Sequence, residues 1–193
     1  DQNTIIISST GGLEEVIYPV TRLNGIKAIK ITTLSPDIYT VELRKQESYD
    51  SCVPSEGVVI HKASYIPTSN VNAIVTETVG NNPLNPGGSY TNNNHNFKVN
   101  VISNQPNDGV LISICAIPHD GMTITDDTKF CKGTYQISGS IIVDGNYLTV
   151  DCNDAVLIDA QGQVNSPGLI YIDDGEVTNA KFRILPISQS SRA

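Results

Sequence analysis

Apolar and polar residues alternate along the first part of the chain with the period of β-strands. The segment Phe97-Lys-Val-Asn-Val-Ile is the clearest case, because Phe97, Val99 and Val101 fall on one face of a strand while Lys98 and Asn100 fall on the other. Helical periodicity is almost absent, and runs of Val, Ile and Thr alternate with Gly, Pro, Asn and Asp. We therefore predict an all-β fold, with strands at 4–8, 16–21, 28–33, 39–44, 57–62, 73–79, 96–103 and 110–114.

These predicted strands lie roughly ten residues apart, which is typical of an antiparallel β-sandwich whose sheets each bury one face. The turn-forming run Asn104-Gln-Pro-Asn-Asp-Gly109 predicts that the strand at 96–103 pairs with Gly109-Val-Leu-Ile-Ser-Ile-Cys115. We expect this sandwich to occupy residues 1–117 and a second β-rich segment to occupy 118–193.

The second segment has shorter apolar runs, separated by turn residues. Strands at this rhythm can coil as a parallel β-solenoid, in which each rung buries its inner face only by stacking on the next, and about two or three rungs would fit. The alternative is that these strands extend the sandwich. The runs are Tyr135-Gln-Ile, Ser140-Ile-Ile-Val, Leu148-Thr-Val, Val156-Leu-Ile and Leu169-Ile-Tyr-Ile.

The charge balance restricts the partners of the chain. Its 193 residues include 12 Lys and Arg against 20 Asp and Glu, for a formal net charge of −8. Without a basic cluster to displace phosphate counterions, neither a nucleic-acid partner nor an anionic membrane surface is expected. The longest apolar runs are far shorter than the roughly 18 residues of a spanning helix, so we expect no membrane insertion.

Several features are typical of an exported protein. The start, Asp1-Gln-Asn-Thr-Ile, has neither an initiator Met nor a signal-peptide pattern, which indicates a mature or excised chain. Residues 186–193 are typical of a loose tail. Few Lys and four Cys favour an oxidising compartment, although four buried free thiols are the alternative. The disulfide candidates are Cys52, Cys115, Cys131 and Cys152.

The chain contains no complete catalytic motif. His61, His95 and His119 form no His-Glu-x-x-His and no pair at i,i+4, and no Cys-x-x-Cys occurs. His61 follows an apolar run and His95 lies in a polar hairpin tip, so we expect surface imidazoles. We therefore predict a protein that is not an enzyme, with no catalytic residue, no cofactor and no metal site.

Adjacent carboxylates occur at Asp126-Asp127 and in Asp173-Asp174-Gly175. We interpret both pairs as solvated turns, because neighbouring residues of a strand point to opposite faces. Ca²⁺ binding through their oxygens is the alternative, although the spacing of an EF-hand is absent. The Tyr residues are scattered, so a carbohydrate-binding face has only the Asn and Tyr content in its favour.

Two blocks of the first segment match a known pattern. The first is Tyr39-Thr-Val-Glu-Leu-Arg44, followed by Ser48-Tyr-Asp50 and Pro54-Ser-Glu-Gly-Val-Val-Ile-His61; the second is Leu84-Asn-Pro-Gly-Gly-Ser-Tyr90 with the strand from Phe97. They resemble the domain that follows the catalytic domain in secreted metallopeptidases of the immune inhibitor A and gametolysin families. The resemblance covers residues 1–117 and carries no catalytic residue, because the zinc motif of these families lies upstream. Cys52, in the matched turn, is a candidate partner of Cys115.

The second segment resembles the first rungs of secreted right-handed β-helix proteins. The matching residues are Phe130-Cys-Lys-Gly-Thr-Tyr135, Ile141-Ile-Val and Leu148-Thr-Val-Asp-Cys-Asn153. Such chains often join the two corresponding cysteines, which implies a disulfide between Cys131 and Cys152.

We expect a non-catalytic extracellular or cell-surface β-domain of a secreted metallopeptidase-like protein, with a structural or surface-attachment role. The alternative function is a self-assembling subunit of a cell-surface or extracellular filament, which would pair through exposed strand edges. Both imply protein partners or self-association. A carbohydrate-binding module is a third class.

Overall fold

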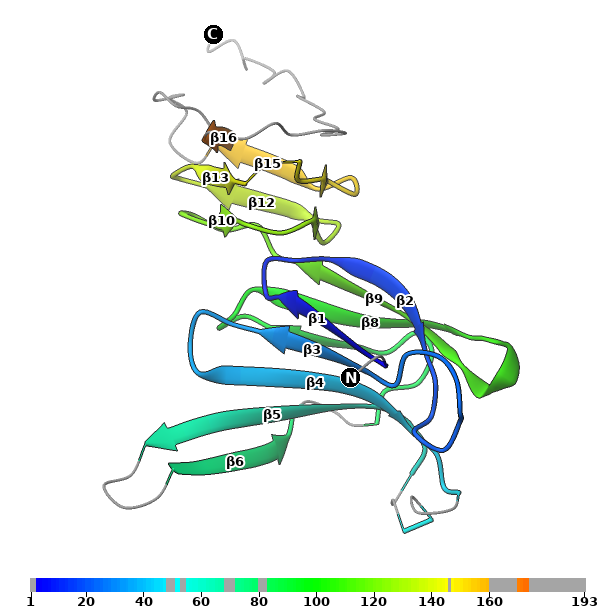
Figure 1. Cartoon of the computed structure of the whole chain (residues 1–193). Coiled ribbons are helices and arrows are strands. Elements are labelled where there is room, and N and C mark those ends of the chain that lie inside the picture. Colours follow the sequence, from blue (N-terminus) through cyan, green and yellow to red (C-terminus); the bar gives the residue numbers. More distant parts are fainter. Residues whose placement is uncertain are drawn as a thin grey trace, which may run out of the picture.

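The fold is all-β, as the alternation predicts. A computed structural model describes residues 3–47, 51–52, 55–67, 72–79, 83–145, 147–159 and 170–173. Two facing sheets form the lower part of the molecule in Figure 1, and a stack of short parallel strands rises above them. The described residues contain no apolar helix of membrane-spanning length.

The first sheet of the sandwich has five strands in the order β1-β3-β4-β5-β6. All neighbours are antiparallel except β1 and β3, which run parallel. They do so because the strand between them in the sequence belongs to the other sheet. The chain therefore enters β1 and β3 from the same side of the first sheet. The strands are β1 (Thr4–Ser8), β3 (Ala28–Thr32), β4 (Asp37–Arg44), β5 (Gly57–Pro67) and β6 (Asn72–Thr78).

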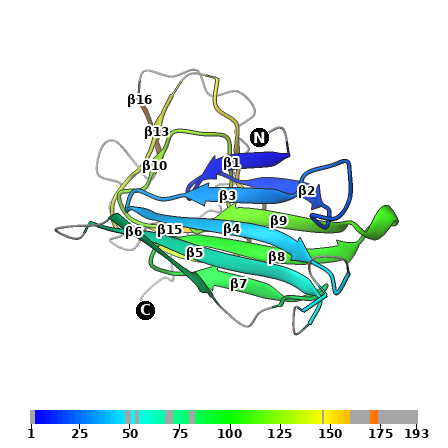
Figure 2. The same ribbon diagram turned by 60° about the horizontal axis from the view of Figure 1, so that its bottom comes forward.

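The second sheet has four strands in the order β2-β9-β8-β7 and lies behind the first in Figure 2. The predicted pairing of 96–103 with 109–115 is confirmed, and the tight turn between β8 and β9 places Asn107 and Asp108 at positive φ. The sequence prediction missed β7 and placed β2 too late, because Pro19 ends that strand early. The strands are β2 (Leu13–Ile17), β7 (Ser89–Asn92), β8 (Phe97–Asn104) and β9 (Val110–Ala116).

The sandwich core lies between the two sheets. Phe97, Val99 and Val101 of β8 are almost completely buried, which confirms the face predicted from their alternation. They meet Ile29 and Val41 of the first sheet, both fully buried. Each buried aliphatic or aromatic side chain contributes about 1.5–3 kcal/mol to stability, so this layer supplies most of the driving force for the sandwich.

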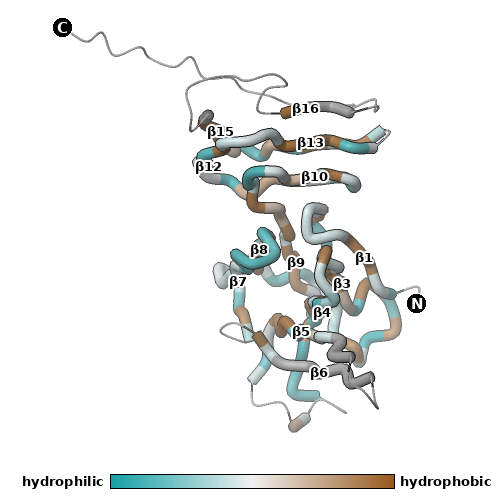
Figure 3. The backbone as a smooth tube through the Cα atoms, turned by 90° about the vertical axis from the view of Figure 1, so that its left-hand side faces the viewer, coloured by the Kyte–Doolittle hydropathy of each residue, from teal (hydrophilic) through white to brown (hydrophobic). Residues whose placement is uncertain are grey.

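The downstream strands form a parallel β-solenoid, and the alternative of an extended sandwich is wrong. Each strand pairs in parallel with the strand one turn later, in three separate small sheets. Figure 3 shows the resulting rungs edge-on above the sandwich. The sheets are β10-β13-β16, β11-β14 and β12-β15, with β10 (Thr123–Ile124), β11 (Thr128–Lys129), β12 (Thr134–Ile137), β13 (Ile141–Asp144), β14 (Val150–Asp151), β15 (Val156–Asp159) and β16 (Ile170–Asp173).

Polar side chains in the solenoid turns bond to the backbone of the neighbouring rung. Asp120 Oδ1 accepts hydrogen bonds from the N–H groups of Ser138 and Gly139, at 2.6 and 3.2 Å. Asp127 Oδ1 accepts one from the N–H of Thr149 at 2.7 Å. These contacts satisfy turn N–H groups that the short strands leave without a ladder partner. They also account for Asp127 in the carboxylate pair as a turn residue.

The solenoid is seated directly on the sandwich. A parallel bridge joins Ala116, the last residue of β9, to Phe130, and the Cys131 N–H donates to the carbonyl of Ala116 at 2.8 Å. The buried side chain of Ala116 belongs to the solenoid core together with Phe130. In the turn before β2, the N–H of Gly12 donates to the carbonyl of Asp127 at 3.1 Å. The sandwich therefore closes the lower end of the solenoid.

The one disulfide among the described residues joins Cys115 to Cys131, with their Cα atoms 4.9 Å apart. The two pairings expected from the sequence, Cys131 with Cys152 and Cys52 with Cys115, are wrong. The reason is the seating just described, because β9 passes beneath the first rung and brings Cys115 beside Cys131. Cys52 is an exposed free thiol, and Cys152 is a half-buried one in the second rung.

Candidate functional site

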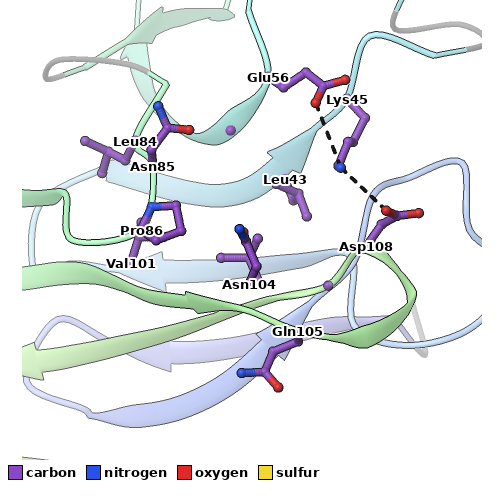
Figure 4. A pocket seen from close by; sticks show the side chains of 13 residues that line it. Leu43, Lys45, Glu56, Leu84, Asn85, Pro86, Val101, Asn104, Gln105 and Asp108 are labelled. Atoms are coloured by element: carbon purple, nitrogen blue, oxygen red, sulfur yellow. Dashed lines mark ion pairs between the residues drawn. The ribbon is translucent and has the colours of Figure 1, made fainter.

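A cavity of about 340 Å³ opens at one end of the sandwich, between the two sheets. Its walls come from the ends of β4 and β8, the starts of β5 and β9, and the loop that precedes β7 (Figure 4). The lining residues are Leu43, Lys45, Glu56, Gly57, Leu84, Asn85, Pro86, Val101, Asn104, Gln105, Asp108, Gly109 and Val110.

The cavity has an apolar floor and a polar rim. Leu43, Leu84 and Val101 are buried members of the sandwich core, and their outer ends form the floor. The amide side chains of Asn85 and Asn104 lie exposed at the rim. The floor of the cavity is thus the end of the hydrophobic layer between the two sheets.

Charged side chains beside the cavity form a connected network. Lys45 Nζ lies between Glu56 Oε2, at 3.9 Å, and Asp108 Oδ1, at 3.6 Å. Arg22 bonds to the same Asp108 carboxylate and lies 2.9 Å from Glu47 Oε1. The hydrogen bond from Arg22 is the largest cause that lowers the pKa of Asp108 below its usual range. This network ties together three connections that are far apart in the sequence.

The contacts of this network favour ionised carboxylates. A general acid that works near neutral pH needs a raised carboxyl pKa, through burial or a neighbouring like charge. Asp108 and Glu47 instead have lowered pKa values, the first through Arg22 and the second mainly through the hydroxyl of Thr21. These contacts favour the ionised, paired state of both carboxylates and join the loops that carry them.

A second polar cluster lies toward the other end of β4. Asp37, at the start of β4, accepts a hydrogen bond from Ser64 Oγ at 2.6 Å, and its other oxygen lies 3.2 Å from His95 Nε2 and 3.4 Å from Lys62 Nζ. The His95 ring packs edge-on against Tyr39, with centroids 5.6 Å apart. The hydrogen bond from Ser64 is the largest cause that lowers the pKa of Asp37.

This cluster contains Ser, His and Asp in the wrong order for a hydrolase. Nucleophile activation requires the imidazole between the hydroxyl and the carboxylate, so that His takes the proton of Ser. Here the carboxylate of Asp37 lies in the middle, and the Ser64 hydroxyl donates to it directly. The cluster therefore joins β4 and β5 to the turn before β8, where His95 lies, and provides no nucleophile.

The remaining histidines lie apart from His95 and from one another. His61 Nε2 lies 2.7 Å from Glu42 Oε1, and His119 Nδ1 lies 3.1 Å from the carbonyl oxygen of Ile117. Within the described residues, no three His, Cys, Asp or Glu side chains are placed to hold a metal ion. Of the second carboxylate pair, Asp173 ends β16, and Asp174 and Gly175 lie outside the described residues.

Sequence reasoning did not identify either polar cluster. Arg22 and Asp108 are 86 residues apart, and no spacing rule connects them. His95 had a local signal, because Asn92 in the same polar run accepts hydrogen bonds from the N–H groups of Asn94 and His95 and so fixes the turn. The surface position expected for His95 is wrong, since only 17% of its side chain is exposed.

Comparison of the chain with protein-family models, with curated proteins and with solved structures gave no match. The likeness of the quoted motifs to a metallopeptidase-associated domain and to secreted β-helix proteins therefore remains a resemblance.

Proposed function

We propose that this chain is a non-catalytic, extracellular structural module, which follows the catalytic domain of a secreted metallopeptidase-like protein and supports a β-solenoid. The observation that carries the proposal is the seating of the first solenoid rung on β9. Ala116 contributes to both the last sandwich strand and the solenoid core, and the Cys115–Cys131 disulfide fixes the junction covalently.

The ends of a solenoid expose the apolar faces of its terminal rungs. A rung buries its inner face only against its neighbours, so the first rung needs a cap that covers its underside. The sandwich supplies such a cap through β9 and the turn before β2. A module of this kind holds a rigid, elongated surface at a fixed position, which is a role in attachment or presentation.

Three features support the extracellular and accessory parts of the proposal. The disulfide favours an oxidising compartment. The motifs of residues 1–117 resemble the segment that follows secreted metallopeptidase catalytic domains. Among the described residues, no three His, Cys, Asp or Glu side chains are placed to hold a metal ion, and the Ser64 hydroxyl donates to Asp37 and not to His95.

The sequence of the gene on the 5′ side of the Asp1 codon tests the metallopeptidase part. An in-frame His-Glu-x-x-His with a third downstream ligand supports it, and a signal peptide that ends at Asp1 refutes it. The non-catalytic part is tested by incubating the purified chain with casein and Zn²⁺. We expect no hydrolysis, whereas turnover that stops on addition of a chelator and is absent from a mock purification would refute it.

A further inference from the structure

The strand β1 is an edge of the five-stranded sheet, and half of its backbone groups face away from its only neighbour. The carbonyl of Asn3 and the N–H of Ser9 bond to the β3 side, to Lys27 and Thr32. In a parallel ladder the groups of alternate residues face the same neighbour, so the odd-numbered residues of β1 face β3. The N–H and C=O groups of Thr4 and Ile6 therefore point outward.

This edge lacks the usual protection against pairing. Natural edge strands are commonly blocked by charged residues, by Pro or by being very short. The edge strands β2 and β6 carry Glu residues, and β7 has only four residues. By contrast, β1 reads Thr-Ile-Ile-Ile-Ser, without a charge or a Pro. Its central side chain, Ile6, is 63% exposed, although Ile is usually buried.

A groove of about 340 Å³ runs beside the same strand. It is lined by residues of β1, by the last residue of β3, by the turn before β2 and by the first solenoid rung: Ile6, Ile7, Ser8, Thr32, Gly11, Gly12, Asp126 and Asp127. Both aspartates are exposed, and within the described part of the chain neither forms an ion pair. The groove thus combines free backbone groups, an apolar side chain and negative charge.

We propose that the outer edge of β1 binds an extended segment of another protein, which adds a strand to the sheet and places a Lys or Arg side chain beside Asp126 and Asp127. Backbone hydrogen bonds to Thr4 and Ile6 supply the register, a β-branched residue covers Ile6, and the basic residue supplies selectivity. A second copy of this chain is the less suitable occupant, because its β1 carries no cation and each copy has a formal net charge of −8. This inference goes beyond the structural role and does not depend on it.

Amide hydrogen exchange, measured residue by residue by NMR on the whole chain, tests the proposal. The probe is the capped peptide acetyl-Thr-Val-Thr-Val-Thr-Lys-amide, titrated to millimolar concentration. We expect exchange at Thr4 and Ile6 to slow about tenfold at ten times the dissociation constant, with Ile5 and Ile7 unchanged because their N–H groups already bond to β3. No slowing at Thr4 and Ile6 would overturn the proposal.

Two controls separate strand addition from nonspecific contact. A peptide that is N-methylated at both Val residues keeps the side chains but loses backbone donors, so it should not slow exchange; equal binding would refute strand addition. The Asp126→Asn variant should weaken binding several-fold, while Asp144→Asn, the same charge change on an exposed solenoid residue outside the groove, should not. Equal effects of the two variants would overturn the role of the groove.

One variant and one concentration series complete the test. Ile6→Pro removes the outward N–H while leaving the bonds of β1 to β3 intact, since Pro is tolerated where a strand N–H faces solvent. It should abolish binding with the fold retained, and unaltered binding would refute the register. In the absence of peptide, amide exchange at Thr4 and Ile6 should not depend on protein concentration. If it slows as the protein concentration rises, the partner is a second copy of the chain and the proposed partner is wrong.

Discussion

The contact between Gly12 and the first solenoid rung gives the sharpest prediction of the structure. A Cβ atom added at Gly12 would lie 2.5 Å from the backbone nitrogen of Lys129, 2.6 Å from its Cβ and 2.9 Å from its Cα. None of these atoms belongs to the flexible end of a side chain, so none can turn aside. The substitution Gly12→Ala should therefore push the solenoid away from the sandwich.

The size of the effect follows from these distances. Ordinary contact begins near 3.4 Å, so the two backbones must separate by about 0.9 Å. That shift breaks the 3.1 Å hydrogen bond from Gly12 N–H to the Asp127 carbonyl and strains the 2.7 Å bond from the Thr128 hydroxyl to the Thr10 carbonyl. One or two lost hydrogen bonds at about 1 kcal/mol each, added to about 1–3 kcal/mol for overpacking, give about 2–5 kcal/mol.

Thermal and urea unfolding of the purified variants measure this loss. For a chain of this length, about 2–5 kcal/mol lowers the Tm by about 4–20 °C. Gly139→Ala is the matched control in the same solenoid, because the nearest atom to its added Cβ lies 3.9 Å away and its backbone has no positive φ. We expect the control to change the free energy of unfolding by less than about 1 kcal/mol. Equal Tm values for Gly12→Ala and Gly139→Ala would refute the seating of the solenoid on the sandwich.

Three further predictions concern the disulfide, the half-buried cluster around Asp37 and the solenoid core. Without reductant, iodoacetamide should label the exposed Cys52 rapidly and Cys152 slowly, because burial raises the pKa of the Cys152 thiol. Peptide mapping should find Cys115 linked to Cys131, and a link from Cys131 to Cys152 would contradict the structure. The lowered pKa of Asp37 stabilises the fold above its usual value of about 4, and this contribution is lost as the pH falls through the lower folded value. The free energy of unfolding of Asp37→Asn should therefore fall less on acidification than that of the unsubstituted chain. If urea unfolding gives the same pH profile for both proteins, the contacts of Asp37 do not contribute to stability as described. Phe130→Ala should cost about 3–5 kcal/mol, since Phe130 is fully buried in the first rung; a urea midpoint equal to that of the unsubstituted chain would show that this core is absent.

Local pattern was sufficient to predict the class of the fold. The alternation around Phe97 identified a buried face because side chains on a strand alternate with period two, whatever the strand pairs with. The short apolar runs after residue 121 predicted further short strands for the same reason, but they left open whether these strands form a solenoid or extend the sandwich. Edge strands were harder, and β7, with the sequence Ser-Tyr-Thr-Asn, has no alternation to detect.

The candidate sites depended on contacts that no local pattern contains. Asp37 meets His95 across 58 residues, and Arg22 meets Asp108 across 86, because both pairs lie where separate connections converge at the sandwich ends. The paired state of these carboxylates was not visible in the sequence. Only the geometry shows that Asp37 lies between Ser64 and His95.

The cysteines show where the sequence by itself reaches its limit. The sequence predicted that the chain is all-β and acidic, and that its cysteines are candidates for disulfides. It did not determine their partners, because a disulfide needs two Cα atoms within about 7 Å, and that proximity depends on which strands are stacked. The tertiary structure places β9 beneath the first rung, which joins Cys115 to Cys131 and leaves Cys152 one rung above as a free thiol. Alternation is a property of each strand alone, whereas stacking is a property of the whole fold.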